Sequence, residues 1–168
     1  MTLIKFYGLL GWSEQQMKPL VILPKITGAF SFLGSSYIVF SIIRDPKKQE
    51  MTYHRIMFGM SILDMLSSFS GPLLSTWPMP RGYHMYAFGT SATCEAAAFF
   101  HQLGVCGTPL YNCSLVTFYC LLLKHNWTKS RIANVEKYFH IIPWTVCLSV
   151  SIAAIPCKVY GPTAFSCW

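Results

Sequence analysis

Residues 92–123 read ATCEAAAFFHQLGVCGTPLYNCSLVTFYCLLL, and the only formally charged residue among them is Glu95. As a single α-helix this stretch would be about 48 Å long, whereas the hydrocarbon core of a bilayer is about 30 Å thick. A helix of a soluble domain is usually shorter and carries a charged face. The stretch therefore predicts a tilted membrane-spanning helix whose two ends project beyond the hydrocarbon.

Four polar side chains recur along this predicted helix at steps of seven, four and seven residues. They are His101, Thr108, Asn112 and Tyr119. These steps place the four side chains roughly on one helical face. Because a helix surrounded by lipid needs no polar stripe, we expect this stripe to face other helices of a bundle.

The composition of the whole chain agrees with a membrane protein. Of its 168 residues, 53% are hydrophobic and only 11% are charged, against about 25% charged residues in soluble domains. We predict an all-α integral membrane bundle of four transmembrane helices after a short extracellular tail, residues 1–19. The predicted spans cover about residues 20–43, 56–77, 92–123 and 138–160.

Basic residues gather in two of the predicted loops, residues 44–55 and 124–137. Their basic side chains are Arg44, Lys47, Lys48, Arg55, Lys124, Lys129, Arg131 and Lys137. Since cytoplasmic loops carry an excess of Lys and Arg, both loops are predicted to be cytoplasmic and the N-terminus to be outside, most simply in the plasma membrane. The net charge of +7 is thus assigned to loops that face anionic lipid, and we expect no nucleic-acid partner.

One carboxylate lies well inside the second predicted span. On insertion scales, Asp64 at such a depth costs about 2.5 to 3.5 kcal/mol. Ser61, Ser68, Gly71 and Ser75 share its helical face, so Asp64 is expected to point into the bundle. Two interpretations remain open: an intramembrane polar switch, or a protonated acid that is hydrogen-bonded to a neighbouring helix.

The sequence contains no recognisable catalytic or metal-binding pattern. Its histidines and cysteines lack the spacing of zinc ligands, and no acid–base pair, Ser-His-Asp arrangement or phosphate loop is evident. We therefore predict no catalytic residue, no metal, no cofactor and no enzymatic activity. On the predicted topology, Cys94 lies in the oxidising outer compartment and could form a disulfide with Cys167 or with Cys157. Cys167 is the favoured partner.

Several segments resemble seven-helix G-protein-coupled receptors. Residues 33–46 (LGSSYIVFSIIRDP), 53–68 (YHRIMFGMSILDMLSS) and 94–104 (CEAAAFFHQLG) are similar to the cyclic-AMP-receptor-like group. The Cys167-Trp168 pair resembles the outer loop of that group and of secretin-like receptors. The resemblance covers about residues 20–168 and implies the first four helices of seven, with a disulfide between Cys94 and Cys167.

The resemblance implies ligand binding outside the cell and coupling to a heterotrimeric G protein inside, by a receptor of which this chain is an incomplete N-terminal portion. The third predicted helix ends in LLLKHNWT and has no Asp-Arg-Tyr motif, so the activation chemistry of rhodopsin-type receptors is not carried over. The alternative functions are a small four-helix transporter or channel subunit, with Asp64 in its pore, and a four-span scaffold without a ligand.

Overall fold

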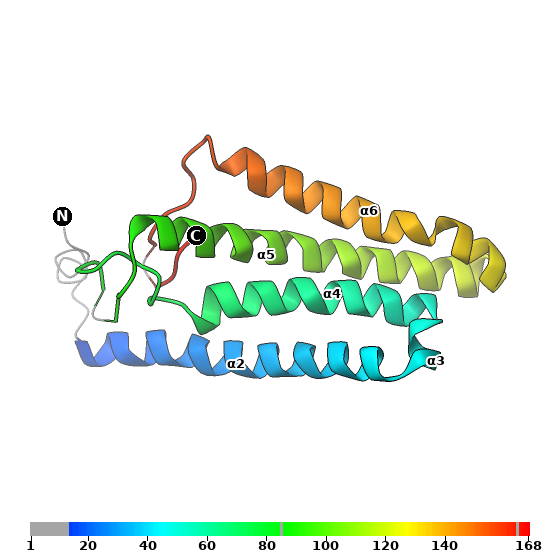
Figure 1. The fold of residues 1–168 in the computed structure, drawn as a ribbon, viewed down its shortest axis with the longest axis horizontal. Coiled ribbons are helices and arrows are strands. Elements are labelled where there is room, and N and C mark those ends of the chain that lie inside the picture. The colour runs from blue at the N-terminus through cyan, green and yellow to red at the C-terminus, as the bar shows by residue number, and fades with distance from the viewer. Residues whose placement is uncertain (1–13, 85, 164) are drawn as a thin grey trace.

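The structure is a computed structural model that describes residues 14–84, 86–163 and 165–168. Over these residues the chain is all-α, with no named strand and only two isolated β-bridges in its loops. These residues form four long helices and one short helix. The long helices lie side by side, and the short helix joins the first two (Figure 1). The elements are α2 (Glu14–Arg44), α3 (Pro46–Gln49), α4 (Thr52–Ser68), α5 (Ser91–Tyr119) and α6 (Lys129–Ala154), with π-helical turns η1 (Phe69–Leu73) and η2 (Cys120–Lys124).

Three of the helices are long and apolar enough to cross a membrane. These candidate spans are Lys18–Arg44, Thr52–Leu73 and Ser91–Lys124. Such helices satisfy their own backbone hydrogen bonds, as a hydrocarbon environment requires. The protein is therefore a multi-pass membrane protein. The predicted tail falls mostly on residues 1–13, which lie outside the described residues, and residues 14–19 belong to α2.

Helix α6 is not among these candidate spans, although a fourth span was predicted over residues 138–160. Its first nine residues include Lys129, Arg131, Glu136 and Lys137, and the helix ends at Ala154, six residues before the predicted end. Pro156 explains this end, because it has no N–H for the helical ladder and its ring clashes with the preceding turn. The apolar part of α6 is thus shorter than predicted.

The predicted loop over residues 44–55 is also wrong in its extent. Asp45 caps α3 by accepting a hydrogen bond from the backbone N–H of Lys47, and Pro46 occupies the first turn of α3. Helix α4 then begins at Thr52, so Arg55 lies in its first turn rather than in a loop. At the other end of α4, Pro72 is accommodated in η1, and the helical segment ends at Leu73 rather than at Trp77.

Glycines allow α4 and α5 to approach closely. A Cβ atom added at Gly104 would overlap the backbone of Leu63 and the side chain of Ser67. Gly59 gives room to the ring of Tyr111, which is fully buried between the helices. Small residues favour such contacts in membranes, where packing rather than water exclusion drives helix association. The interface between α4 and α5 therefore forms the centre of the bundle.

Candidate functional site

The helices place polar residues in three clusters along the bundle. We name the two ends of the bundle by their contents. The disulfide end contains Cys94 and Cys167, and the α3 end contains α3 together with the connection between α5 and α6. Figure 1 shows these two ends at opposite sides of the molecule.

At the disulfide end, Cys94 in the first turns of α5 is bonded to Cys167 in the segment after α6, and both residues are buried. This is the predicted pair, and Cys157 is a free, exposed thiol. Gly161 and Trp168 exchange two backbone hydrogen bonds of 2.8 and 2.9 Å, which close the segment into a tight loop. The bundle end is thus covered by a loop that is covalently tied to α5.

The same loop reaches into the bundle. The ring of Trp168 meets the ring of His101 edge-on, with centroids 4.8 Å apart. His101 Nδ1 lies 3.1 Å from the carbonyl oxygen of Ser67 on α4, and the ring fits because Gly71 has no side chain there. The hydroxyl of Ser75 donates to the carbonyl of Phe165 at 2.8 Å. These contacts connect the disulfide-tied loop with α5 and with the turn after η1, and His101 extends the connection to α4.

At the disulfide end, a lysine in the first half of α2 connects this helix to the end of η1. Lys25 Nζ donates to the carbonyl of Leu74 at 2.9 Å and lies 4.2 Å from the centroid of the Trp77 ring. A cation is favourable there because the last carbonyls of a helical segment carry partial negative charge. In the loop beyond, burial lowers the pKa of His84, and the positive charge of Lys25 lowers this pKa further.

Asp64 lies in the middle cluster, between α2 and α4. One of its carboxylate oxygens accepts hydrogen bonds from Ser35 and from Ser31, the latter at 3.2 Å, and Ser68 donates to Ser31 at 2.9 Å. Hydroxyl groups from a neighbouring helix replace the water that this carboxyl group would otherwise need. The cluster therefore connects α2 and α4 directly.

The four residues of the predicted polar stripe of α5 do not all face the same neighbouring helix. His101 contacts α4 as described, and the Thr108 hydroxyl is buried without a hydrogen-bond partner among the described residues. Asn112 is exposed on these helices. Tyr119 is 40% exposed and lies against Tyr53 of α4, with ring centroids 5.9 Å apart. Only the first half of the stripe thus packs inside this bundle.

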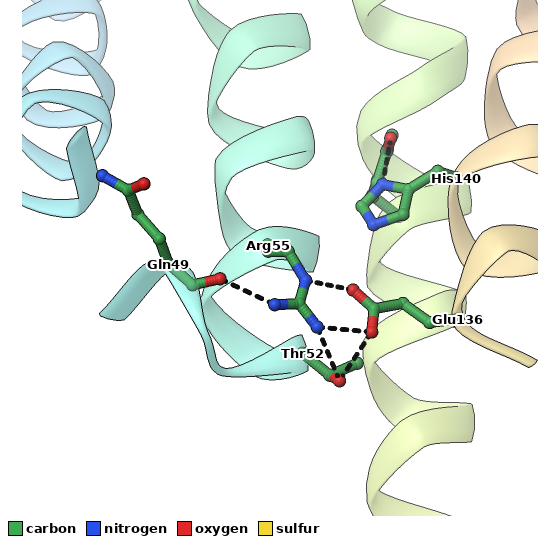
Figure 2. A network of polar contacts seen from close by, with 6 residues as sticks. Gln49, Thr52, Arg55, Glu136 and His140 are labelled. Carbon is green, nitrogen blue, oxygen red and sulfur yellow. Dashed lines mark hydrogen bonds and ion pairs between the residues drawn. The ribbon is translucent and has the colours of Figure 1, made fainter. Parts of the chain in front are cut away.

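At the α3 end, an ion pair ties α4 to α6. Arg55 contacts both carboxylate oxygens of Glu136, with Nη2 donating to Oε2 at 2.6 Å (Figure 2). The Thr52 hydroxyl donates to the same oxygen at 2.8 Å, and Arg55 Nη1 donates to the backbone carbonyl of Gln49 at 2.7 Å. A forked arginine–carboxylate pair of this kind fixes direction as well as distance.

These contacts favour the ionised form of Glu136. The hydrogen bonds from Arg55, the largest effect, lower the pKa of this carboxyl group, and burial opposes them. One turn further along α6, the His140 ring lies 3.0 Å from the Tyr111 hydroxyl of α5. Three helices are therefore connected by polar contacts at this end.

The remaining predicted basic residues are spread over the α3 end. Arg44 lies over the Phe40 ring and Lys137 over the Tyr138 ring, at 5.8 and 5.3 Å from the ring centroids. Lys48 is half-buried and donates to the Ser41 hydroxyl at 2.6 Å. The other four are exposed, namely Lys47, Lys124, Lys129 and Arg131. Within the described part of the chain, Arg55 is the one residue of the eight that forms an ion pair with an acid.

Sequence reasoning missed the partners that complete these clusters. Glu136 and Thr52 are separated by 84 residues, and Ser35 and Asp64 by 29. One feature of the sequence could have indicated the ion pair. Glu136 is the only acid in residues 124–137, and the basic residues 44–55 were predicted to lie on the same side of the membrane. Nothing local in the sequence indicated that Trp168 contacts His101.

Openings among the described residues could admit other molecules. A cavity of about 670 Å³ lies between α5 and the segment after α6, with walls that include Phe99, Phe100 and Ile155 and one charge of each sign from Glu95 and Lys158. Smaller cavities lie at the α3 end, one of about 420 Å³ whose walls include Ile43, Arg55 and Phe58, and one of about 190 Å³ where α2, α3 and α4 meet. Within the part of the chain that the structure describes, no three potential metal ligands lie close enough to hold an ion.

Comparison with known proteins adds one relative. The chain is 26% identical over 166 residues to the Frizzled/smoothened-like sans CRD protein A of Dictyostelium discoideum. The alignment covers 94% of this chain but 29% of that relative, so the chain spans less than a third of its length. No protein-family model and no solved structure matches the chain. The chain is thus distantly similar to a frizzled/smoothened-like protein.

Proposed function

We propose that this chain forms the first four helices of a seven-helix, G-protein-coupled receptor of the cyclic-AMP-receptor-like or secretin-like group. The disulfide between Cys94 and Cys167 supports this most directly, because it ties the start of the third long helix to the loop after the fourth. The distant similarity to a frizzled/smoothened-like protein agrees with the proposal. The disulfide end is then extracellular and the α3 end cytoplasmic, in the plasma membrane.

The polar contacts suggest how a signal would cross the membrane. A ligand that moves the disulfide-tied loop would move Trp168 against His101, which is bonded to the Ser67 carbonyl of α4. The next residue, Ser68, belongs to the cluster that holds Asp64. In this proposal Asp64 is a polar switch whose hydrogen bonds set the position of α4 relative to α2.

The α3 end would form part of the G-protein surface. Arg55 serves the link between α4 and α6, whereas the other seven predicted basic side chains form no ion pair among the described residues. The transporter alternative gains no support from Asp64, because two hydroxyl groups of α2 donate hydrogen bonds to this carboxyl group and Asp64 does not line the cavities described above.

Three experiments test this proposal. Glycosylation acceptor sites engineered next to Tyr83 should be modified and those next to Lys129 should not, and the reverse pattern would refute the orientation. Cells that express the complete reading frame should activate a G protein, and Asp64→Asn should reach the membrane yet shift basal activation. The 168-residue chain alone, purified and reconstituted, should not drive nucleotide exchange. Exchange by this chain would show that it is not an incomplete receptor.

A further inference from the structure

A cavity of about 190 Å³ lies at the α3 end, where α2, α3 and α4 meet. Its apolar walls include Ile38, Ile42 and Met57. Its polar walls include Ser41, Lys48 and His54. The lining of the cavity therefore includes both apolar and polar side chains, as a site for an amphiphile requires.

The position of this cavity fixes its depth in the membrane. The first candidate span ends at Arg44 and the second begins at Thr52, so the cavity lies where two apolar stretches end together. Lipid headgroups occupy this layer at the edge of the hydrocarbon core. Ile38 and Met57 lie about one and a half helical turns inside these span ends, at the depth of the first acyl carbons, whereas Ile42 lies close to the edge.

The charge of the cavity is positive. The Lys48 ammonium carries three N–H donors and uses one on Ser41, at 2.6 Å. Among the described residues, Lys48 is the only lysine, arginine or acid that lines the cavity, because neither Arg44 and Lys47 nor the acids Asp45 and Glu50 line it. A negatively charged group in the cavity would therefore meet the positive charge of Lys48.

We propose that this cavity binds the headgroup of an anionic phospholipid, with Lys48 donating hydrogen bonds to the phosphate and with one acyl chain lying along Ile38, Ile42 and Met57. Basic pockets between membrane helices are suited to such headgroups, and the cytoplasmic leaflet supplies anionic lipid. The assignment of this leaflet rests on the orientation proposed above. Binding itself does not, since both leaflets of a reconstituted bilayer can carry the same lipid.

The test uses the 168-residue chain in nanodiscs of phosphatidylcholine that contain phosphatidylserine as a minor component. Native mass spectrometry then measures how much phosphatidylserine each variant retains relative to phosphatidylcholine. Lys48→Gln should lower this preference about fivefold, the effect expected for one lysine at an anionic surface. Lys129→Gln is the matched control, because Lys129 is an exposed lysine at the same end of the bundle, and it should retain the parental preference.

Two further variants separate binding from folding. Lys48→Arg keeps the charge, and Ser41→Ala removes the hydrogen bond but leaves the ammonium group free, so both should retain phosphatidylserine as the parent does. A photoreactive phosphatidylserine should also label residues 37–57 of the unmodified chain.

Three results would overturn the proposal. The first is equal retention by the parent and Lys48→Gln. The second is labelling confined to residues outside 37–57. The third is competition by soluble glycerophosphoserine at the concentration at which the lipid binds, which would make a free phosphate compound the ligand.

Discussion

The ion pair between Arg55 and Glu136 gives the sharpest prediction about the stability of the bundle. Glu136 is 12% exposed and accepts hydrogen bonds from Arg55 and Thr52, whereas the Arg55 side chain is 39% exposed. Exposed ion pairs contribute about 0 to 1 kcal/mol, and breaking a buried pair costs about 3 to 5 kcal/mol. Because one partner is buried and the other is partly hydrated, Glu136→Gln should lower the free energy of unfolding by about 2 kcal/mol.

The assay is reversible unfolding of the purified chain in mixed detergent micelles, applied to Arg55→Gln, Glu136→Gln and the double variant. If the two side chains stabilise each other, the double variant should be less destabilised than the sum of the single variants, by about 1 kcal/mol. Lys129→Gln, an exposed charge on the same helix α6, serves as the control and should change stability by less than about 0.5 kcal/mol.

Additive effects within about 0.3 kcal/mol would refute this reasoning, because independent sites add in that way. An equal loss of stability in Lys129→Gln would refute it as well, since the change in stability would then depend on net charge rather than on the contact between Arg55 and Glu136. A matching loss in Thr52→Val would instead identify the hydroxyl bond as the dominant contact.

Other predictions use the same unfolding assay. Stability should fall as the pH drops through the lowered folded-state pKa of Glu136, because the unfolded carboxyl group takes up its proton first, and Glu136→Gln should abolish this part of the pH dependence. Gly104→Ala should destabilise the bundle by about 1 to 3 kcal/mol through overlap with α4, whereas Gly34→Ala, with open space around it, should be neutral or slightly stabilising. Peptide mapping without reductant should find Cys94 linked to Cys167. Replacing both cysteines with Ser should lower the free energy of unfolding by about 4 kcal/mol or less, since the bridge joins positions 73 residues apart. A free Cys94 thiol, or a Gly34→Ala loss equal to that of Gly104→Ala, would contradict these expectations.

The sequence by itself determined the helices and the class of protein. Apolar length decides whether a segment can lie in hydrocarbon, and that property is local, so the long helices appeared near their predicted positions. The boundaries that were wrong also had local causes. Pro72 and Pro156 interrupt the helical ladder earlier than the apolar pattern suggests, and Asp45 and Pro46 form a short helix within a predicted loop.

Only the tertiary structure decided which polar groups meet. The partner of Arg55 lies 81 residues away on α6, and the hydroxyl groups around Asp64 belong to α2. Such pairs depend on how far each helix is rotated and shifted against its neighbour. Close packing sets these quantities, at positions such as Gly104 where backbone meets backbone. Helical periodicity fixes the faces of one helix but not the register between two helices, because register is a property of the interface and not of either sequence segment.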